Sequence, residues 1–274
     1  MQKIWVCGAR GQIGQAVNDV VDKLEFEMLD TDVDDLDVTD TDEVLRFGEM
    51  NRPDIIINCS GMTDISSCEE NPSQAFKVNA LGARNLAIVA AKMQAKMVQL
   101  STDDVFDGKS TEPYTEFDIT NPGTVYGKSK LAGENYVKEF TTKHFIVRST
   151  WVYGKGQNFI NGFLKKVDAG EQLSIASDQF GSPTSANELA RFLLHLVHTS
   201  EYGTYHATNK GVCSRYAFAQ EILKMTGKTA SMQPVPTVMS DFSKVRPAYA
   251  VLDNFIMSMV PIYDFPDWQG SLRE

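Results

Sequence analysis

The stretch Ile4-Trp5-Val6-Cys7-Gly8-Ala9-Arg10-Gly11-Gln12-Ile13-Gly14 decides the fold. Its first four residues are an apolar run typical of a buried strand, and apolar residues from Ile13 to Leu24 then recur at helical spacing. Glycines between a strand and a helix let the chain turn tightly, approach a pyrophosphate and pack the helix closely. The first turn of such a helix presents free N–H groups to phosphates. The stretch therefore predicts a dinucleotide-binding turn formed by Gly8, Arg10, Gly11, Gln12, Ile13 and Gly14.

Further strands and helices alternate along the first half of the chain. Apolar runs predict strands at 26–29, 54–58, 97–100 and 145–147. Helical periodicity predicts one long helix from 71 onward and others over 123–140, 185–198 and 214–225. This alternation is typical of an α/β fold with a doubly wound parallel sheet, the Rossmann architecture. Because the pattern loosens after Trp151, we expect a dinucleotide-binding domain at 1–150 and a smaller C-terminal substrate-binding lobe at 151–274, partly interleaved with the first.

The composition is that of a globular protein without a membrane span. Hydrophobic residues make up 42% and charged residues 23% of the 274 residues, and no stretch reaches the roughly 20 apolar residues that cross a bilayer. The N-terminus leads directly into a strand rather than a signal peptide, so we expect a cytoplasmic protein. A net charge of −10 argues against nucleic-acid partners. Four cysteines without paired spacing predict neither a disulfide framework nor a metal site.

An acidic residue ends the second predicted strand. Asp30 is placed to accept hydrogen bonds from the adenosine ribose hydroxyls of a dinucleotide, and it would repel a 2′-phosphate. The sequence therefore favours NADH over NADPH. Arg10 in the phosphate turn would partly offset that repulsion, which leaves the use of both cofactors open.

A tyrosine and a lysine lie four residues apart in a predicted helix. Tyr126 and Lys130 share one helix face, and an ammonium beside a phenol favours the phenolate. A tyrosine tuned in this way can protonate a ketone oxygen while a hydride arrives at the carbon. Thr102 follows directly on the fourth predicted strand, at the sheet edge where open α/β sheets bind ligands. We therefore predict a catalytic triad of Thr102, Tyr126 and Lys130.

With these elements in place, the chain resembles the extended short-chain dehydrogenase/reductases, and within them the dTDP-4-dehydrorhamnose reductases. The likeness runs through nearly the whole length. Besides the glycine turn, it rests on Leu36-Asp37-Val38-Thr39-Asp40, Val78-Asn79-Ala80-Leu81-Gly82, Ser101-Thr102-Asp103, Val105-Phe106-Asp107-Gly108, residues 125–134, Trp151-Val152-Tyr153-Gly154, residues 178–184 and Arg246-Pro247.

The resemblance implies NAD(P)H-dependent reduction of the C4 ketone of a dTDP-6-deoxy-4-keto sugar, which would give dTDP-L-rhamnose for cell-surface polysaccharide. Tyr126 would be the acid, Lys130 would tune it and hold the nicotinamide ribose, and Thr102 would orient the ketone. The residues implied to line the dinucleotide are Gly11, Gln12, Ile13, Asp30, Asp37, Val38, Gly61, Met62 and Thr63. Ile65, Asp103, Asp104 and Trp151 would face the dTDP-sugar. We expect a monomer or homodimer.

Two departures from the family pattern affect the substrate side. The family usually reads Ser-Thr-Asp-Tyr-Val-Phe, and here Asp104 stands in place of that tyrosine. The loop after the third strand, residues 60–69, also differs. Two alternatives stay open: a sugar-nucleotide dehydratase or epimerase, because dehydrating relatives carry two acidic residues after this threonine, and a catalytically silent dinucleotide-binding regulatory subunit such as that of methionine adenosyltransferase.

Overall fold

Six parallel strands form the central sheet of the computed structural model, which describes residues 1–239 and 247–273. Their order across the sheet is β10-β5-β4-β3-β1-β2. The bounds are β1 (Gln2–Cys7), β2 (Phe26–Thr31), β3 (Ile55–Asn58), β4 (Lys96–Thr102), β5 (His144–Ser149) and β10 (Gly203–His206). The order reverses between β1 and β3, at the kind of switch point where open α/β sheets bind ligands. The predicted doubly wound parallel sheet is confirmed.

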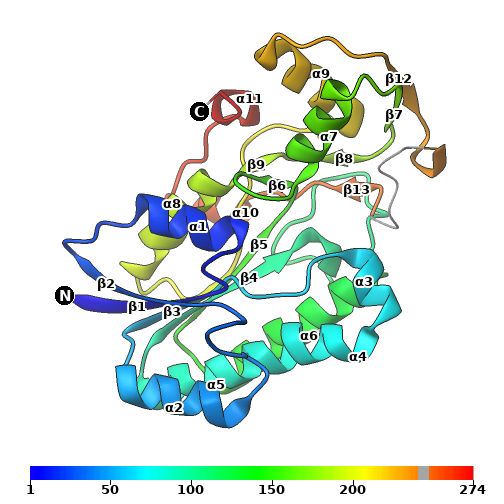
Figure 1. Cartoon of the computed structure of the whole chain (residues 1–274). Coiled ribbons are helices and arrows are strands. Elements are labelled where there is room, and N and C mark those ends of the chain that lie inside the picture. Colours follow the sequence, from blue (N-terminus) through cyan, green and yellow to red (C-terminus); the bar gives the residue numbers. More distant parts are fainter. Residues whose placement is uncertain (240–246, 274) are drawn as a thin grey trace.

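Helices cover both faces of this sheet (Figure 1). One face carries α1 (Gln12–Val20) and α8 (Ala186–Val197), and the other carries α2 (Thr41–Asn51), α5 (Ala83–Met93) and α6 (Val125–Phe140). Strand side chains alternate between the two cores: Ile4 and Val6 pack toward α1 and α8, while Trp5 and Cys7 pack toward the opposite layer. Each fully buried large side chain contributes about 1.5–3 kcal/mol. The unbroken apolar strands are thus explained by a sheet covered on both sides.

A second lobe sits above the carboxyl ends of the strands (Figure 1). Its core joins Phe163, Leu173, Ile175, Phe218 and Ile222 from two helices and one strand. The lobe elements are α7 (Phe159–Asp168), β7 (Leu173–Ala176), α9 (Arg215–Thr226) and β12 (Met232–Val235), with short strands β6 (Val152–Tyr153), β8 (Phe180–Gly181), β9 (Thr184–Ser185), β11 (Cys213–Ser214) and β13 (Tyr249–Ala250). The short helices η3 (Thr237–Met239), α10 (Phe255–Met259) and α11 (Trp268–Ser271) complete the described chain.

Several elements differ from their predicted bounds. The first helix ends at Val20, and Leu24 is 89% exposed, because Asp22 accepts a hydrogen bond from the backbone of Leu24 and turns the chain into β2. The long helix predicted from residue 71 is divided into α4 (Pro72–Phe76), the π-helix η1 (Lys77–Gly82) and α5. The predicted elements did not include α2, α7 or the short α3 (Ile65–Glu70).

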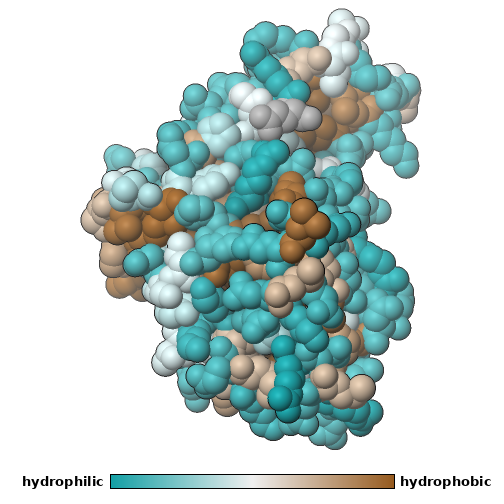
Figure 2. Space-filling model, turned by 90° about the vertical axis from the view of Figure 1, so that its left-hand side faces the viewer, coloured by the Kyte–Doolittle hydropathy of each residue, from teal (hydrophilic) through white to brown (hydrophobic). Residues whose placement is uncertain are grey.

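The face of the molecule shown in Figure 2 is predominantly hydrophilic, and its apolar side chains gather in separate areas. Within residues 1–239 and 247–273, no helix combines the length and apolar character needed to cross a membrane. Arg246, half of the predicted Arg246-Pro247 motif, lies outside the described residues.

Candidate active site

The predicted phosphate turn is built on close backbone packing. Gly8 has a φ of +76°, and the backbone N–H groups of Gly8 and Ala9 both donate to Thr31 O of β2, at 2.8 and 3.1 Å. A Cβ on Gly8 would lie 2.8 Å from Ser60 N, and one on Gly14 would lie 2.3 Å from Gly8 O. Any larger residue at these two positions would therefore displace the turn. Gly11 is the N-cap of α1 and makes no side-chain cap, so the N–H groups of the first helical turn are open to a ligand.

A cavity of about 670 Å³ lies between this turn and the second lobe. Its wall includes Gly11, Gln12, Ile13, Gly61, Thr63, Thr102, Asp103, Tyr126, Lys130 and Trp151 from the predicted site. The size is that of an ordinary small-ligand pocket. The structure therefore brings the three predicted catalytic residues and the phosphate turn to one cavity.

Tyr126 and Lys130 are placed by the start of α6. Thr124 caps the helix by accepting a hydrogen bond from Gly127 N at 2.9 Å. Gly127 lets the helix pack against the short 3₁₀ turn η2 (Asp103–Val105), since a Cβ there would lie 2.0 Å from Asp104 O. This close packing holds the helix that carries Tyr126 and Lys130 against the residues that follow Thr102.

Lys130 is almost completely buried, with 4% of its surface exposed. Burial lowers the pKa of Lys130 from 10.5 to about 8, against the opposing charge of Glu134. Keeping Lys130 charged in this buried position therefore costs free energy, and the negative charge of Glu134 offsets that cost only in part.

A buried ion pair ties α6 to the sheet below the cavity. Arg148 of β5 donates to both carboxylate oxygens of Glu134, from Nε at 2.9 Å and from Nη2 at 2.7 Å, and Ser101 Oγ of β4 donates at 2.5 Å. Burial acts to raise the pKa of Glu134, but the hydrogen bond and charge of Arg148 and the hydrogen bond of Ser101 outweigh it and lower the pKa. The pair fixes α6 relative to β4, and with it Lys130 relative to Thr102.

Asn79 holds the loop after β3, a role that was not predicted from the sequence. Its Oδ1 accepts from Met62 N at 2.8 Å, while its Nδ2 donates to Met62 O and to Ser129 Oγ, both at 2.9 Å. Asn79 lies in the π-helix η1, a helix irregularity common at functional sites. A Cβ on Gly61 would lie 3.0 Å from Asn79 Oδ1, so Gly61 permits this contact. The Val78-Asn79-Ala80-Leu81-Gly82 motif was the sequence signal for it.

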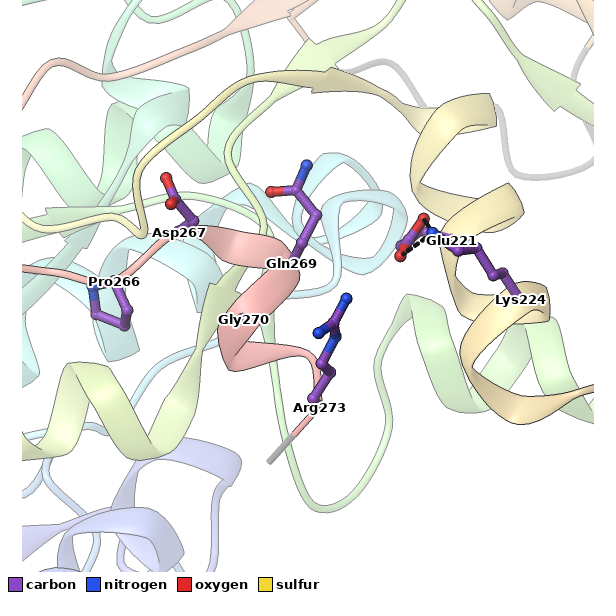
Figure 3. Close-up of a pocket in the computed structure, with 7 residues that line it drawn as sticks. All are labelled: Glu221, Lys224, Pro266, Asp267, Gln269, Gly270 and Arg273. Atoms are coloured by element: carbon purple, nitrogen blue, oxygen red, sulfur yellow. Dashed lines mark hydrogen bonds and ion pairs between the residues drawn. The ribbon is translucent and has the colours of Figure 1, made fainter.

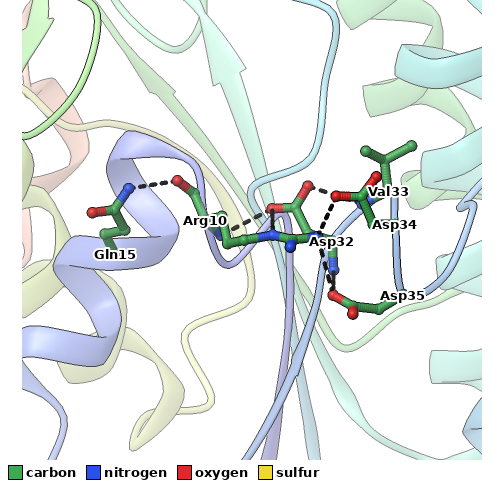
Figure 4. Close-up of polar contacts among 6 residues, drawn as sticks. All are labelled: Arg10, Gln15, Asp32, Val33, Asp34 and Asp35. Atoms are coloured by element: carbon green, nitrogen blue, oxygen red, sulfur yellow. Dashed lines mark hydrogen bonds and ion pairs between the residues drawn. The ribbon is translucent and has the colours of Figure 1, made fainter.

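The acidic residues that follow β2 contact both the backbone and the side chain of Arg10 (Figure 4). Arg10 N donates to Asp32 Oδ2 at 2.9 Å, and the guanidinium pairs with Asp34 at 3.1 Å and Asp35 at 3.3 Å. Asp30 bonds instead to Asn18 of α1; partial burial raises its pKa, against that hydrogen bond and the charge of Lys23. Asp32 therefore contacts the phosphate turn directly, which sequence reasoning missed.

Other predicted residues lie away from the cavity wall. Asp37 is exposed and accepts from Thr39 N at 2.8 Å, whereas Val38 is packed in the core beside α5. Ile65 is 2% exposed and packs behind Tyr126, and Asp104 is 1% exposed. The structure thus does not bring Ile65 or Asp104 to the cavity wall, because α3 and η2 turn both side chains into the protein.

A second pocket lies between α9 and α11 (Figure 3). It is lined by Glu221, Lys224, Pro266, Asp267, Gln269, Gly270 and Arg273. Lys224 already pairs with Glu221 at 3.1 Å, and no predicted site residue lines this pocket. The chemistry expected from the sequence therefore belongs to the cavity at the sheet edge.

Comparison with known proteins identifies the family. The model of the family described as "RmlD substrate binding domain" matches residues 1–274. The chain belongs to this family. The predicted resemblance is thereby confirmed, as is the Rossmann-type fold.

Individual relatives cover the chain almost completely. The chain is 34% identical over 275 residues to the spore coat polysaccharide biosynthesis protein SpsK of Bacillus subtilis, with 100% of this chain and 96% of that protein covered. The solved dTDP-4-dehydrorhamnose reductase of Clostridium acetobutylicum is 40% identical with a TM-score of 0.96, covering 99% of this chain and 97% of its own. That of Bacillus anthracis, solved in complex with NADP, is 36% identical with a TM-score of 0.96, covering 99% and 98%.

Proposed function

We propose that this protein reduces the C4 ketone of a dTDP-6-deoxy-4-keto sugar with NAD(P)H, converting dTDP-4-dehydro-L-rhamnose to dTDP-L-rhamnose for polysaccharide synthesis. The observation that supports the proposal is one cavity shared by Thr102, Tyr126, Lys130 and the uncapped start of α1. The relatives named dTDP-4-dehydrorhamnose reductases, one of them in complex with NADP, support the same reaction.

The residues present fit a dinucleotide. Gly8 and Gly14 have no space for a side chain, and the helix start that they shape offers N–H donors to a pyrophosphate. We assign the binding of the dinucleotide to this turn, to Asp30 with Asp37 and Val38, and to Gly61, Met62 and Thr63, with Lys130 at the nicotinamide ribose. The carboxylates around Arg10 favour NADH over NADPH, because they already neutralise the guanidinium.

The chain's own residues supply the proton and the orientation. When bound, NAD(P)H supplies a hydride to the carbonyl carbon. Tyr126 gives its phenolic proton to the carbonyl oxygen, so the ketone becomes an alcohol, and the Lys130 ammonium stabilises the phenolate that is left. Thr102 orients the ketone by hydrogen bonding; its hydroxyl donates to Asp103 Oδ1 at 3.2 Å and would turn to the substrate.

We place the dinucleotide on residues 1–150 and the sugar nucleotide against the lobe at 151–274, with Asp103 and Trp151 on the substrate side. Helix α8 and strand β10 return from this second part to the main sheet and are the interleaved portion. In this arrangement Ile65 and Asp104 are buried behind the residues that line the cavity. We propose a cytoplasmic monomer or homodimer.

The test uses the purified protein, NADH or NADPH, and an enzymatically generated dTDP-4-keto-6-deoxy sugar. Loss of one NAD(P)H per sugar reduced is the expected result. Conversion of the sugar without cofactor loss would instead indicate a dehydratase or epimerase. Cofactor binding without either change would indicate the regulatory subunit. Conversion without cofactor loss would also assign a catalytic role to Asp103, because dehydrating relatives carry two acidic residues after this threonine and Asp104 does not line the cavity.

A further inference from the structure

Arg215 is a nearly buried cation on the lobe side of the catalytic cavity, and no role was predicted for it. Its side chain lies over the indole of Trp151, with 3.4 Å between Cζ and the ring centroid, and 4.7 Å from the centroid of Phe159. Arg215 is 8% exposed, yet it lines the same cavity as Thr102 and Tyr126. A guanidinium stacked on aromatic rings keeps its N–H donors in its own plane, at its edge.

The backbone around this stack is under constraint. Trp151 has a φ of +47°, in the left-handed region that a bulky residue rarely adopts. Gly181 of β8 packs against the indole, and a Cβ there would lie 2.4 Å from its Cε2. Arg215 N donates to Gln179 O at 3.0 Å, which fixes the start of α9 beside the same strand. Strain of this kind persists where the surrounding structure enforces it, and it is concentrated at functional sites.

The lobe side of the cavity offers positive charge to an anion. Among the described residues that line the cavity, Lys130 and Arg215 are basic and Asp64 and Asp103 are acidic; of these four, Arg215 alone comes from the second lobe. Arg215 is also the first residue of α9, a helix of 12 residues whose N-terminus adds partial positive charge. Planar guanidinium groups bind phosphate oxygens through two parallel hydrogen bonds. A nucleoside diphosphate that reaches the lobe side of the cavity would meet both positive groups.

We propose that Arg215 binds the diphosphate of the sugar-nucleotide substrate, and that Trp151 and Phe159 hold its guanidinium in place. The proposal rests on the function proposed above, since it assigns the substrate's charged group. Trp151 then acts as a positioning residue for Arg215, in addition to its place on the cavity wall. The assignment gives a reason for the strained backbone of Trp151, which follows β5 beside the end of the strand that carries Thr102.

The test measures binding of dTDP and thymidine by calorimetry, without turnover. Arg215→Gln is expected to weaken dTDP binding about 10- to 100-fold, the worth of a charged hydrogen bond, and to leave thymidine binding within about threefold. Arg215→Lys keeps the charge without the planar guanidinium, so its affinity for dTDP should lie between that of the wild type and that of Arg215→Gln. Trp151→Leu should weaken dTDP binding although Arg215 remains. Lys224→Gln, an exposed change on the same helix, is the matched control and should bind dTDP like the wild type.

Two further readouts separate a binding role from a structural one. NADH affinity should be unchanged in Arg215→Gln, and in kinetic assays KM for the sugar nucleotide should rise more than kcat falls. Wild-type dTDP binding in Arg215→Gln, or equal losses for NADH, thymidine and dTDP, would overturn the proposal. If the wild type binds dTDP through Arg215 but reduces no dTDP-4-keto sugar, the anion site stands and the proposed reaction fails.

Discussion

Burial of Lys130, the lysine proposed to act in catalysis, should make the ligand-free protein more stable as pH rises above about 8. Lys130 is 4% exposed, and burial lowers its pKa from 10.5 to about 8. Below pH 8 the lysine is charged in both the folded and unfolded chains, so folding bears the full cost of burying the charge. Between about pH 8 and 10.5 the folded protein releases a proton that the unfolded chain keeps, and the cost disappears.

The magnitude follows from the two pKa values. At about 1.36 kcal/mol per pKa unit, the difference between 10.5 and about 8 corresponds to roughly 3 kcal/mol. Lys130→Met removes the charge, keeps the side-chain length and is well tolerated in helices. This variant should therefore be more stable than the wild type at pH 7 by about 3 kcal/mol, and the difference should vanish toward pH 10.5.

The assay is urea unfolding of both proteins between pH 7 and 10, followed by circular dichroism. Lys128→Met is the matched control, because Lys128 lies on the same helix and is exposed. That variant should differ little from the wild type at any pH. A Lys130→Met protein that is less stable at pH 7, or a difference that does not change with pH, would refute the reasoning. Loss of reductase activity in the stabilised variant would show that stability is given up for catalysis.

Four other substitutions test the site. Tyr126→Phe keeps the buried ring, so cofactor affinity should persist while kcat falls about 10²- to 10⁴-fold; wild-type turnover would remove Tyr126 from the mechanism. Asp30→Ala should weaken NADH and narrow its advantage over NADPH in titrations, and tighter NADPH binding by the wild type would contradict this. Glu134→Gln breaks a fully buried pair and should cost about 3–5 kcal/mol in urea unfolding. Asp104→Asn should leave the sugar KM and the reaction type unchanged, since Asp104 does not line the cavity, and a large change in KM would place it there.

The parts of the site that could be predicted from the sequence depend on local geometry. The glycine turn is specified by contacts within a few residues or with the adjoining strands, as at Gly14 against Gly8 O. The pairing of Tyr126 with Lys130 needs only the repeat of one helix. The apolar strands were recognised because a sheet covered on both faces requires them. In each case a short segment contains most of the physical constraint.

Local patterns could not show which way a turn directs its side chains. Thr102, Asp103 and Asp104 are consecutive, yet the 3₁₀ turn leaves Thr102 and Asp103 on the cavity wall and buries Asp104. Likewise, Asp30 and Asp32 are two residues apart in the sequence, but only the packing of the loop against Arg10 brings Asp32 to the phosphate turn. Side-chain direction in such short turns depends on what packs against them, which here is α6 through Gly127.

The substrate side was harder to predict because its contacts join distant parts of the chain. Trp151 follows β5, Gly181 lies in β8, and Arg215 begins α9 after the chain has passed through the main sheet at β10. The sequence identified Trp151 by its motif but could not pair it with a cation 64 residues away. If Arg215 binds the diphosphate, the lobe recognises the group that sugar nucleotides share, while the sugar is selected nearer Thr102 and Asp103. The departure at residues 60–69, which contribute Ser60, Gly61, Thr63 and Asp64 to the cavity wall, would then alter the choice of sugar without weakening the binding of the nucleotide.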